Sequence, residues 1–176
     1  MIASRTDTVE PIPIQHGTVR LRPEAAADAA FLCALHDSVK GTELAALPVG
    51  DPVRRQLLDM QYRAMTESYH AAFPNGRFDL ITLNEEPIGR LISDLNQGLL
   101  RIVYIALLPE WRSHGICTAL MRSVLQTPGR PVTQCEATVA VDNPASLGLW
   151  FRLGFAERAR SETDLVLEWR RIRNTS

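Results

Sequence analysis

The sequence predicts an α/β fold built on a mixed sheet, with residues 1–176 forming a single domain. Its 176 residues, 45% of them hydrophobic, suit one domain with one core, and no linker rich in Gly or Ser divides them. Three strand-like runs follow one another between residues 78 and 108, the pattern of a β-meander. Strand-like and helix-like segments then alternate along the rest of the chain, which indicates a mixed sheet.

The first half of the chain predicts one strand and two helices. Residues 1–16 are expected to form a loose lead-in, and residues 18–22, which alternate in polarity, are expected to form a short strand. Apolar side chains four residues apart predict a helix over residues 24–39. A second helical spacing predicts a helix over residues 53–72, with Asp51 as its candidate N-cap.

The second half predicts a hairpin, a further strand and then alternating helices and strands. Turn residues separate the apolar runs, and Asn143 and Gly154 carry the signals of a helix start and a helix end. The expected elements are strands over residues 78–83, 88–95 and 99–108, a helix over 115–125 ended by residues 127–129, a strand over 132–141, a helix from 143 to 154 and a strand over 163–169.

Composition excludes several classes of protein. With 19 Lys+Arg against 20 Asp+Glu and a formal net charge of −1, the chain is not a generally basic nucleic-acid-coating protein. Its three cysteines form no CxxC pair and its four histidines show no metal spacing, so neither a disulfide framework nor a metal site is expected. No apolar run resembles a signal peptide or a membrane span. The sequence therefore predicts a cytoplasmic protein that binds neither nucleic acid nor membrane.

The chemically informative segment lies where the strand over residues 99–108 passes into the helix over 115–125. Pro109 breaks the strand, and a short polar loop enters the helix at Gly115. Such a junction directs unpaired backbone N–H groups and the positive end of a helix dipole at one spot, which suits a phosphate. The segment lacks the lysine of a P-loop and the spacing of a GxGxxG fingerprint. Pyrophosphate binding and an ordinary strand–helix connection are both compatible with it.

Two segments resemble the motifs of one family. Arg112-Ser113-His114-Gly115-Ile116-Cys117 is similar to the Q/R-x-x-G-x-G/A motif of the GNAT superfamily of acyl-CoA-dependent N-acetyltransferases. Residues 143–155 resemble the N-x(6)-Y-x(3)-G-F segment of the same superfamily. The match covers roughly residues 78–155, and it implies a mixed, mostly antiparallel sheet flanked by helices.

The resemblance implies acetyl-CoA as co-substrate and a role for each matching position. Ile105, Ala106 and Leu107 would offer backbone hydrogen bonds to the pantetheine arm and the acyl carbonyl, and Asn143 would lie near the same arm while capping its helix. Cys117 replaces the family's Gly or Ala, and a buried, inert thiol is the expectation there. The residues expected around the pyrophosphate are Ser113, His114, Gly115, Ile116, Cys117 and Thr118, with Arg112 nearby.

Three further positions depart from the family pattern. Trp150 stands where many members carry a tyrosine that protonates the departing CoA thiolate. An indole N–H can donate a hydrogen bond but cannot act as an acid. Arg101 and Thr138 stand where relatives often keep a glutamate base. Any acid or base must therefore come from other residues.

Tyr104 and Glu136 are the candidates for these catalytic roles. Tyr104 lies just before the cofactor segment and could protonate the thiolate, although a core tyrosine with a satisfied hydroxyl is the alternative. Glu136 could receive the amine's proton through a water, although a solvated carboxylate is the alternative. Asp94 is a weaker candidate base of the same type.

The predicted activity is N-acetylation of a primary amine by direct transfer from acetyl-CoA in a ternary complex. The acceptor, which is a small-molecule amine, a peptide N-terminus or a protein lysine, would lie near Tyr62 and Tyr69, which share a helical face close to Gln61 and His70. The alternative for these tyrosines is a core position. The alternative function is a catalytically reduced GNAT-fold module that senses acyl-CoA or binds a partner. The length of the acyl group and a homodimer remain open.

Overall fold

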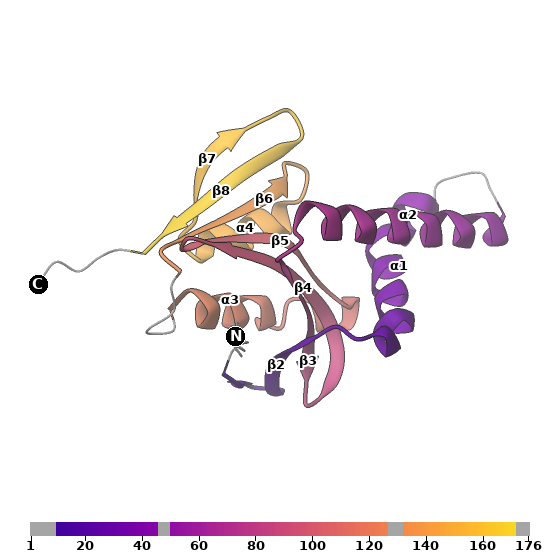
Figure 1. Ribbon diagram of the computed structural model, residues 1–176, viewed down its shortest axis with the longest axis horizontal. Helices are drawn as coiled ribbons and strands as arrows, with labels where there is room; N and C mark the ends of the chain where they lie inside the picture. The colour runs from indigo at the N-terminus through magenta and orange to yellow at the C-terminus, as the bar shows by residue number, and fades with distance from the viewer. Residues whose placement is uncertain (1–9, 46–49, 127–131, 172–176) are drawn as a thin grey trace, which may run out of the picture.

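One eight-stranded sheet runs through the protein in the order β1-β2-β3-β4-β5-β6-β8-β7 (Figure 1). The computed structural model describes residues 10–45, 50–126 and 132–171. Every neighbouring pair in the sheet is antiparallel except β5 and β6. The expected α/β fold with a mixed, mostly antiparallel sheet flanked by helices is therefore confirmed.

The elements follow the predicted order closely. The strands are β1 (Ile12–Ile14), β2 (Gly17–Pro23), β3 (Arg77–Leu83), β4 (Glu86–Asn96), β5 (Leu99–Leu107), β6 (Gln134–Ala140), β7 (Ala156–Arg160) and β8 (Asp164–Arg170). The helices are α1 (Ala29–Ala45), α2 (Asp51–Ala72), α3 (Ile116–Gln126) and α4 (Pro144–Arg152), and two 3-10 turns are η1 (Ala26–Asp28) and η2 (Pro109–Trp111). The helix stop expected at residues 127–129 lies outside the described residues.

Two strands escaped the sequence analysis. β1 lies inside the expected lead-in and pairs with β2. β7 is an edge strand whose five residues are all exposed, so it has no apolar alternation to reveal it. β7 is therefore identified by its pairing with β8 alone, whereas Ile12 and Ile14 of β1 also pack against the core.

Two helix starts also differ from expectation. The first helix does not begin at residue 24, because the Asp28 carboxylate accepts from the Ala25 N–H at 2.8 Å and holds the 3-10 turn η1 ahead of α1. The second helix begins at Asp51, whose expected role as N-cap is wrong. Gly50 occupies the N-cap position without a side-chain hydrogen bond, and Asp51 instead pairs with Arg54 at 2.6 Å.

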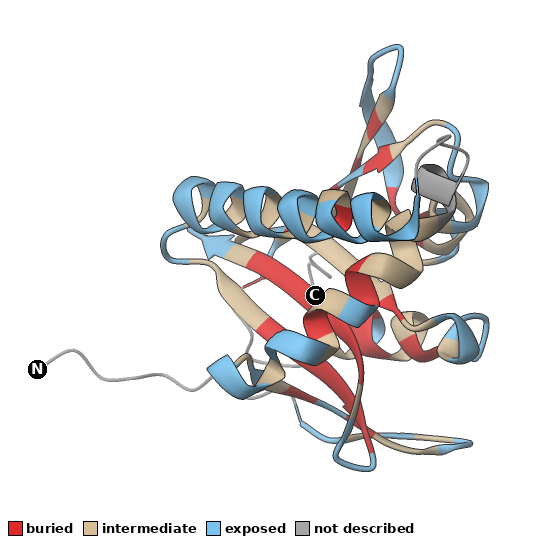
Figure 2. Ribbon diagram, turned by 90° about the vertical axis from the view of Figure 1, so that its right-hand side faces the viewer, coloured by how far each residue is buried: buried red, intermediate tan, exposed pale blue. Residues whose placement is uncertain are grey.

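The two faces of the sheet are covered by different helices. Leu91, Ile102 and Leu107 belong to a buried core that also contains α3 and α4 side chains, and this side is called the α3 face. Arg90 and Tyr104, which pairs with Ile92, point to the opposite side, the α2 face, where α1 and α2 lie. Figure 2 shows how much of the α2 surface is exposed while the strands beneath are buried.

β5 and β6 separate halfway along their length. Their parallel pairing runs only from Leu99↔Gln134 to Ile102↔Ala137. Beyond that point β5 stays with β4 and β6 stays with β8 (Figure 1). Residues 103–107 of β5 therefore have a strand on one side only, and this stretch is called the unpaired edge of β5.

A β-bulge marks the same place. Ile92 pairs with Tyr104 and Ser93 pairs with Ile102, which leaves Val103 as the extra residue of β5. Strict alternation from Ile102 would have put Tyr104 in the core on the α3 face. The extra residue reverses this and sends the Tyr104 side chain to the α2 face.

A buried ion pair lies on the α2 face. Arg90, only 2% exposed, donates from Nε and Nη2 to the two carboxylate oxygens of Glu24, at 2.6 and 3.0 Å. Its guanidinium also lies over the Phe78 ring, 5.9 Å from the centroid. The two hydrogen bonds neutralise the buried charge of Arg90, and they link Glu24, which directly follows β2, to β4 in the middle of the sheet.

We expect Trp150→Ala to destabilise the protein by about 3–5 kcal/mol, because it empties a large core position. Trp150 is 2% exposed and packs edge-on against Phe155 at 4.8 Å. The matched control is its neighbour Phe151, which is 47% exposed, so that Phe151→Ala should change the free energy of unfolding by less than about 0.5 kcal/mol. Chemical denaturation of both variants tests this, and equal losses would contradict the packing.

We expect Glu24→Ala to cost about 3–5 kcal/mol, because it leaves the Arg90 charge buried without its partner. The exposed pair Arg160–Glu157, at 2.9 Å, provides the control, and Glu157→Ala should cost less than about 1 kcal/mol. Adding Arg90→Met to Glu24→Ala should recover part of the loss. A double variant that is less stable than Glu24→Ala would show that Arg90 stabilises the fold independently of Glu24.

Candidate active site

The turn into α3, residues 112–118, presents a row of unused backbone donors, and it is called the α3 entry turn. Ser113 and Gly115 adopt left-handed conformations, with φ of 62° and 74°. The first N–H of the helix with an internal acceptor is that of Ala119, which donates to Gly115 C=O at 2.9 Å. Within the described residues, none of the six N–H groups of residues 113–118 finds an acceptor. Together with the helix dipole they form a site for an anion.

Space in front of the turn is open. A Cβ built on Gly115 meets no atom within 4 Å. The glycine is therefore required for its positive φ and for access from outside, and not for packing against another part of the protein. A phosphate group can reach the backbone there.

Side chains around the turn hold it in place. Arg112 Nε donates to Leu107 C=O at 3.0 Å, which ties the turn to the end of β5. His114 Nδ1 lies 2.7 Å from Arg112 C=O. His16, from the turn between β1 and β2, places its ring 5.0 Å from that of His114. Nothing in the sequence signals this contact, because the two residues lie far apart along the chain.

The unpaired edge of β5 carries further backbone donors. Leu108 N–H donates to Ile88 C=O at 2.9 Å, so Leu107 and Gly89 form a non-hydrogen-bonded pair of the β4–β5 ladder. By alternation, Ile105 and Leu107 direct their own N–H groups away from β4, whereas Ala106 directs its N–H toward β4. Of the three residues expected to bond a ligand through the backbone, Ile105 and Leu107 have the donors positioned for it.

Tyr104 lies at the start of this edge and faces α2. Its ring centroid is 6.2 Å from that of Tyr69. Burial raises the pKa of Tyr104 to about 12, against a smaller opposing effect of Arg90. The phenol therefore stays protonated at neutral pH and can donate a hydrogen bond or a proton.

Cys117 and Thr118 lie in the first turn of α3. Cys117 packs against the core of the α3 face, and burial raises the pKa of its thiol to about 11. The thiol is therefore protonated and unreactive at neutral pH. Both residues are partly buried, and their N–H groups belong to the row described above.

Glu136, on β6, lies in a network of arginine side chains. Its carboxylate forms ion pairs with Arg158 and, at 3.6 Å, with Arg101. Glu168 joins the same network through Arg158 at 3.7 Å. Both carboxylate oxygens of Glu136 therefore lie against guanidinium groups.

Four other residues singled out in the sequence have clear places in the fold. Asp94 is half-buried and pairs in register with Arg101, and Thr138 is exposed on β6. Asn143 caps α4 by accepting from Ser146 N–H at 3.0 Å. Trp150 lies in the core and not at a surface.

The tyrosines expected near the acceptor do gather on the α2 face. Tyr62 and Tyr69 are half-buried on α2, and burial raises the pKa of both phenols. Tyr104 completes what is called the tyrosine cluster (Tyr62, Tyr69 and Tyr104). Gln61 is exposed on the same helix, and His70 stacks on Phe78 with centroids 4.0 Å apart. Arg90, which nothing in the sequence singles out, acts electrostatically on all three tyrosines.

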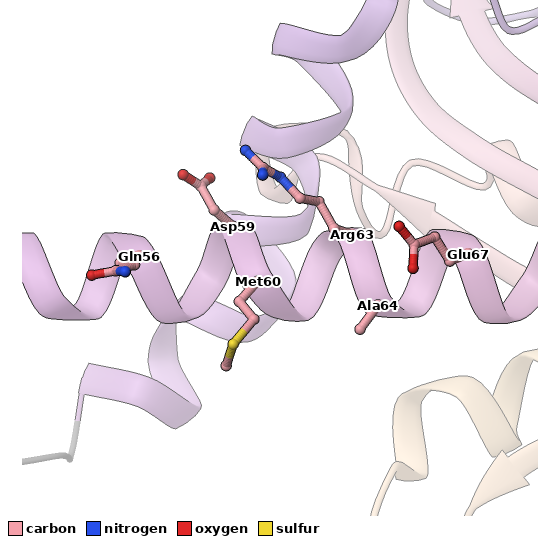
Figure 3. Close-up of a pocket in the computed structure, with 6 residues that line it drawn as sticks. All are labelled: Gln56, Asp59, Met60, Arg63, Ala64 and Glu67. Carbon is pink, nitrogen blue, oxygen red and sulfur yellow. The ribbon is translucent and has the colours of Figure 1, made fainter.

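A separate hollow runs along the outer side of α2 (Figure 3). Asp59 and Arg63 project from one side of the helix and Met60 and Ala64 from the other. It contains no residue that the sequence analysis assigned to the site. In the described ranges, no His, Cys, Asp and Glu side chains group as metal ligands do, and no helix is both long and apolar enough to cross a bilayer.

Comparisons with known proteins agree with this geometry. The model of the acetyltransferase (GNAT) family matches residues 44–155, a range that includes the unpaired edge of β5, the α3 entry turn and α4. The sequence has no significant match among curated proteins.

Solved structures with a similar fold have low sequence identity to the chain. The PaiA N-acetyltransferase of Thermoplasma acidophilum in complex with coenzyme A has a TM-score of 0.64 at 15% identity, covering 87% of this chain and 99% of that chain. RimJ of Mycobacterium smegmatis in complex with CoA-disulfide has a TM-score of 0.65 at 19% identity, covering 93% and 87%. The spermidine N-acetyltransferase of Vibrio cholerae in complex with CoA and spermine has a TM-score of 0.61 at 17% identity, covering 86% and 95%. With the family model spanning most of its length and the fold in agreement, the chain belongs to the acetyltransferase (GNAT) family.

Proposed function

We propose that the protein is an N-acetyltransferase that moves the acetyl group of acetyl-CoA to a primary amine by direct transfer in a ternary complex. The observation that carries the proposal is the row of six N–H groups at residues 113–118 without an acceptor in the described part of the chain. These donors lie at the positive end of α3 and suit a pyrophosphate. Coenzyme A in the solved structures of PaiA and RimJ supports this class of ligand.

The proposed binding site for CoA joins two neighbouring parts of the fold. The pyrophosphate would lie on the α3 entry turn, contacted by the backbone of Ser113, His114, Gly115, Ile116, Cys117 and Thr118, with Arg112 beside it. The pantetheine arm would follow the unpaired edge of β5, where Ile105 and Leu107 offer N–H groups. Asn143 would lie near the arm at the start of α4.

In the proposed reaction, the amine nitrogen attacks the thioester carbonyl carbon. The C–N bond forms, the C–S bond breaks, the nitrogen loses one proton and the CoA sulfur gains one. Holding the two reactants side by side supplies much of the acceleration. Backbone N–H groups of the unpaired edge of β5 would stabilise the oxyanion.

Tyr104 is the proposed proton donor to the sulfur. Its phenol lies on the strand that would hold the thioester, and burial keeps it protonated. Glu136 is left out of the proposed mechanism, because Arg101 and Arg158 hold its carboxylate. The amine's proton would leave to water.

We expect Gly115→Trp to weaken acetyl-CoA binding at least tenfold more than Gly115→Ala does. Both variants bear the cost of a side chain at φ 74°, but only the indole fills the open space before the α3 entry turn. Titration calorimetry with acetyl-CoA measures the difference, and thermal melts check that both variants fold. Equal binding by the two variants would place the pyrophosphate elsewhere, and no binding by the unaltered protein would refute the proposed function.

We expect Tyr104→Phe to lower kcat by at least about tenfold while leaving the Kd of acetyl-CoA unchanged, because the change removes only the donor. Since the pKa of Tyr104 is raised to about 12, the phenol keeps its proton above the ordinary tyrosine pKa of about 10. The rate of the unaltered protein should therefore show no loss from tyrosine ionisation near pH 10. Thiol-release assays across this range test both statements, and an unchanged kcat in Tyr104→Phe would remove Tyr104 as the acid.

A further inference from the structure

The outer side of α2 carries apolar side chains that face solvent. Val53 is 48% exposed and Met60 is 60% exposed, and they are two of the four large apolar side chains that lie exposed among the described residues. Met60 also lines the hollow of Figure 3, which has a volume of about 530 Å³. Exposed apolar side chains that adjoin a hollow suit a surface on which another protein docks.

Four charged residues of alternating sign follow one line along the same helix. Arg55, Asp59, Arg63 and Glu67 are spaced four residues apart, and all four are exposed. Residues at this spacing form a ridge on the surface of a helix, and this set is called the charged ridge of α2. Opposite charges four residues apart can pair within one helix. Within the described residues, however, none of these four side chains forms an ion pair.

Two copies of the charged ridge complement each other when they run in opposite directions. About a two-fold axis midway between positions 59 and 63, Asp59 faces Arg63 of the second copy, and Arg55 faces Glu67 of the second copy. The symmetry repeats each contact, so four pairs of opposite charge form. Packing of such ridges against each other is the commonest way in which helices of globular proteins meet. The pattern of charge therefore matches a second copy of the same helix.

One further charge near the charged ridge agrees with this arrangement. Asp37, on α1, acts electrostatically on the Cys33 thiol together with Asp59 and Arg63, so its carboxylate lies close to the ridge. In the antiparallel arrangement, Arg63 of the second copy faces Asp59 and thus also approaches Asp37. The guanidinium would then meet two carboxylates.

We propose that the protein associates with a second copy of itself through antiparallel packing of the charged ridge of α2. The inference goes beyond the proposed function and does not depend on it, because no residue of the ridge belongs to the proposed CoA site. A helix of 22 residues is about 33 Å long, and one such face per copy makes a contact smaller than the roughly 1,600 Å² of a standard interface. We therefore expect a weak, reversible dimer that salt weakens further.

The first test reverses one charge in each of two variants and then mixes the variants. Asp59→Arg and Arg63→Asp each turn two attractive contacts of the dimer into two repulsive ones, so each should raise the Kd of the dimer at least fivefold. A mixture of the two variants should associate as the unaltered protein does, because both positions are then positive on one copy and negative on the other. Sedimentation velocity over a range of protein concentrations measures all of these associations.

The second test restores the complementarity within one chain. The double variant Asp59→Arg/Arg63→Asp exchanges the two charges and should associate more tightly than either single variant. Arg122→Asp is the matched control, because it makes the same change of charge as Arg63→Asp at an exposed position of α3, on the other face of the sheet. It should leave the Kd unchanged. Thermal melts check that every variant folds.

The outcomes separate the dimer from its arrangement. The Kd of the unaltered protein should rise when NaCl is increased from about 0.05 M to about 0.5 M, because salt screens exposed charges. An unaltered protein that stays monomeric at every concentration would overturn the proposal. A dimer that both single reversals leave intact would place the interface elsewhere and overturn it too. A mixture that associates no better than its two components would refute the antiparallel pairing.

Discussion

The separation of β5 from β6 is the constraint on which the rest of the site depends. The peptide groups of both strands need hydrogen-bond partners, but β5 and β6 pair with each other only as far as Ile102↔Ala137. Beyond it, β4 and β8 satisfy one edge of each strand, and the other edge of β5 remains available to a ligand. Arg112 binds the end of this edge to the α3 entry turn through Leu107 C=O. One break in the sheet therefore places two sets of backbone donors side by side, and a long ligand can contact both.

Backbone donors also explain how a chain with a formal net charge of −1 can hold a pyrophosphate. Unpaired N–H groups and a helix dipole provide local positive potential without any lysine. The arginines meanwhile pair with carboxylates across the α2 face: Arg90 with Glu24, Arg22 with Asp28, and Arg158 with Glu136. Each of these pairs neutralises one positive and one negative charge on that face. The proposed anion site therefore depends on the backbone and the helix dipole and not on a basic surface.

The sequence predicted those parts of the fold that depend on local patterns. Most strands, all four helices and the α3 entry turn were predicted because apolar spacing and Gly115 mark them directly. It could not predict β7, which has no buried residue, or the contact of His16 with His114, which depends on how distant turns pack. The Arg90–Glu24 pair was also out of reach, because strand register decides which charged residues meet. The side chain of Tyr104 could be placed only after the bulge at Val103 was known.

The bulge at Val103 decides which face of the sheet the Tyr104 side chain occupies. Trp150 fills a core position and packs against Phe155, so its role in this fold is structural. A replacement acid must reach the unpaired edge of β5 from the other face of the sheet. Without the extra residue, Tyr104 would have pointed into the same core as Ile102. With it, the phenol meets Tyr69 on the acceptor side, where burial keeps it protonated. One inserted residue in a strand therefore moves the proposed proton donor from the core to the side on which the amine would arrive in the proposed reaction.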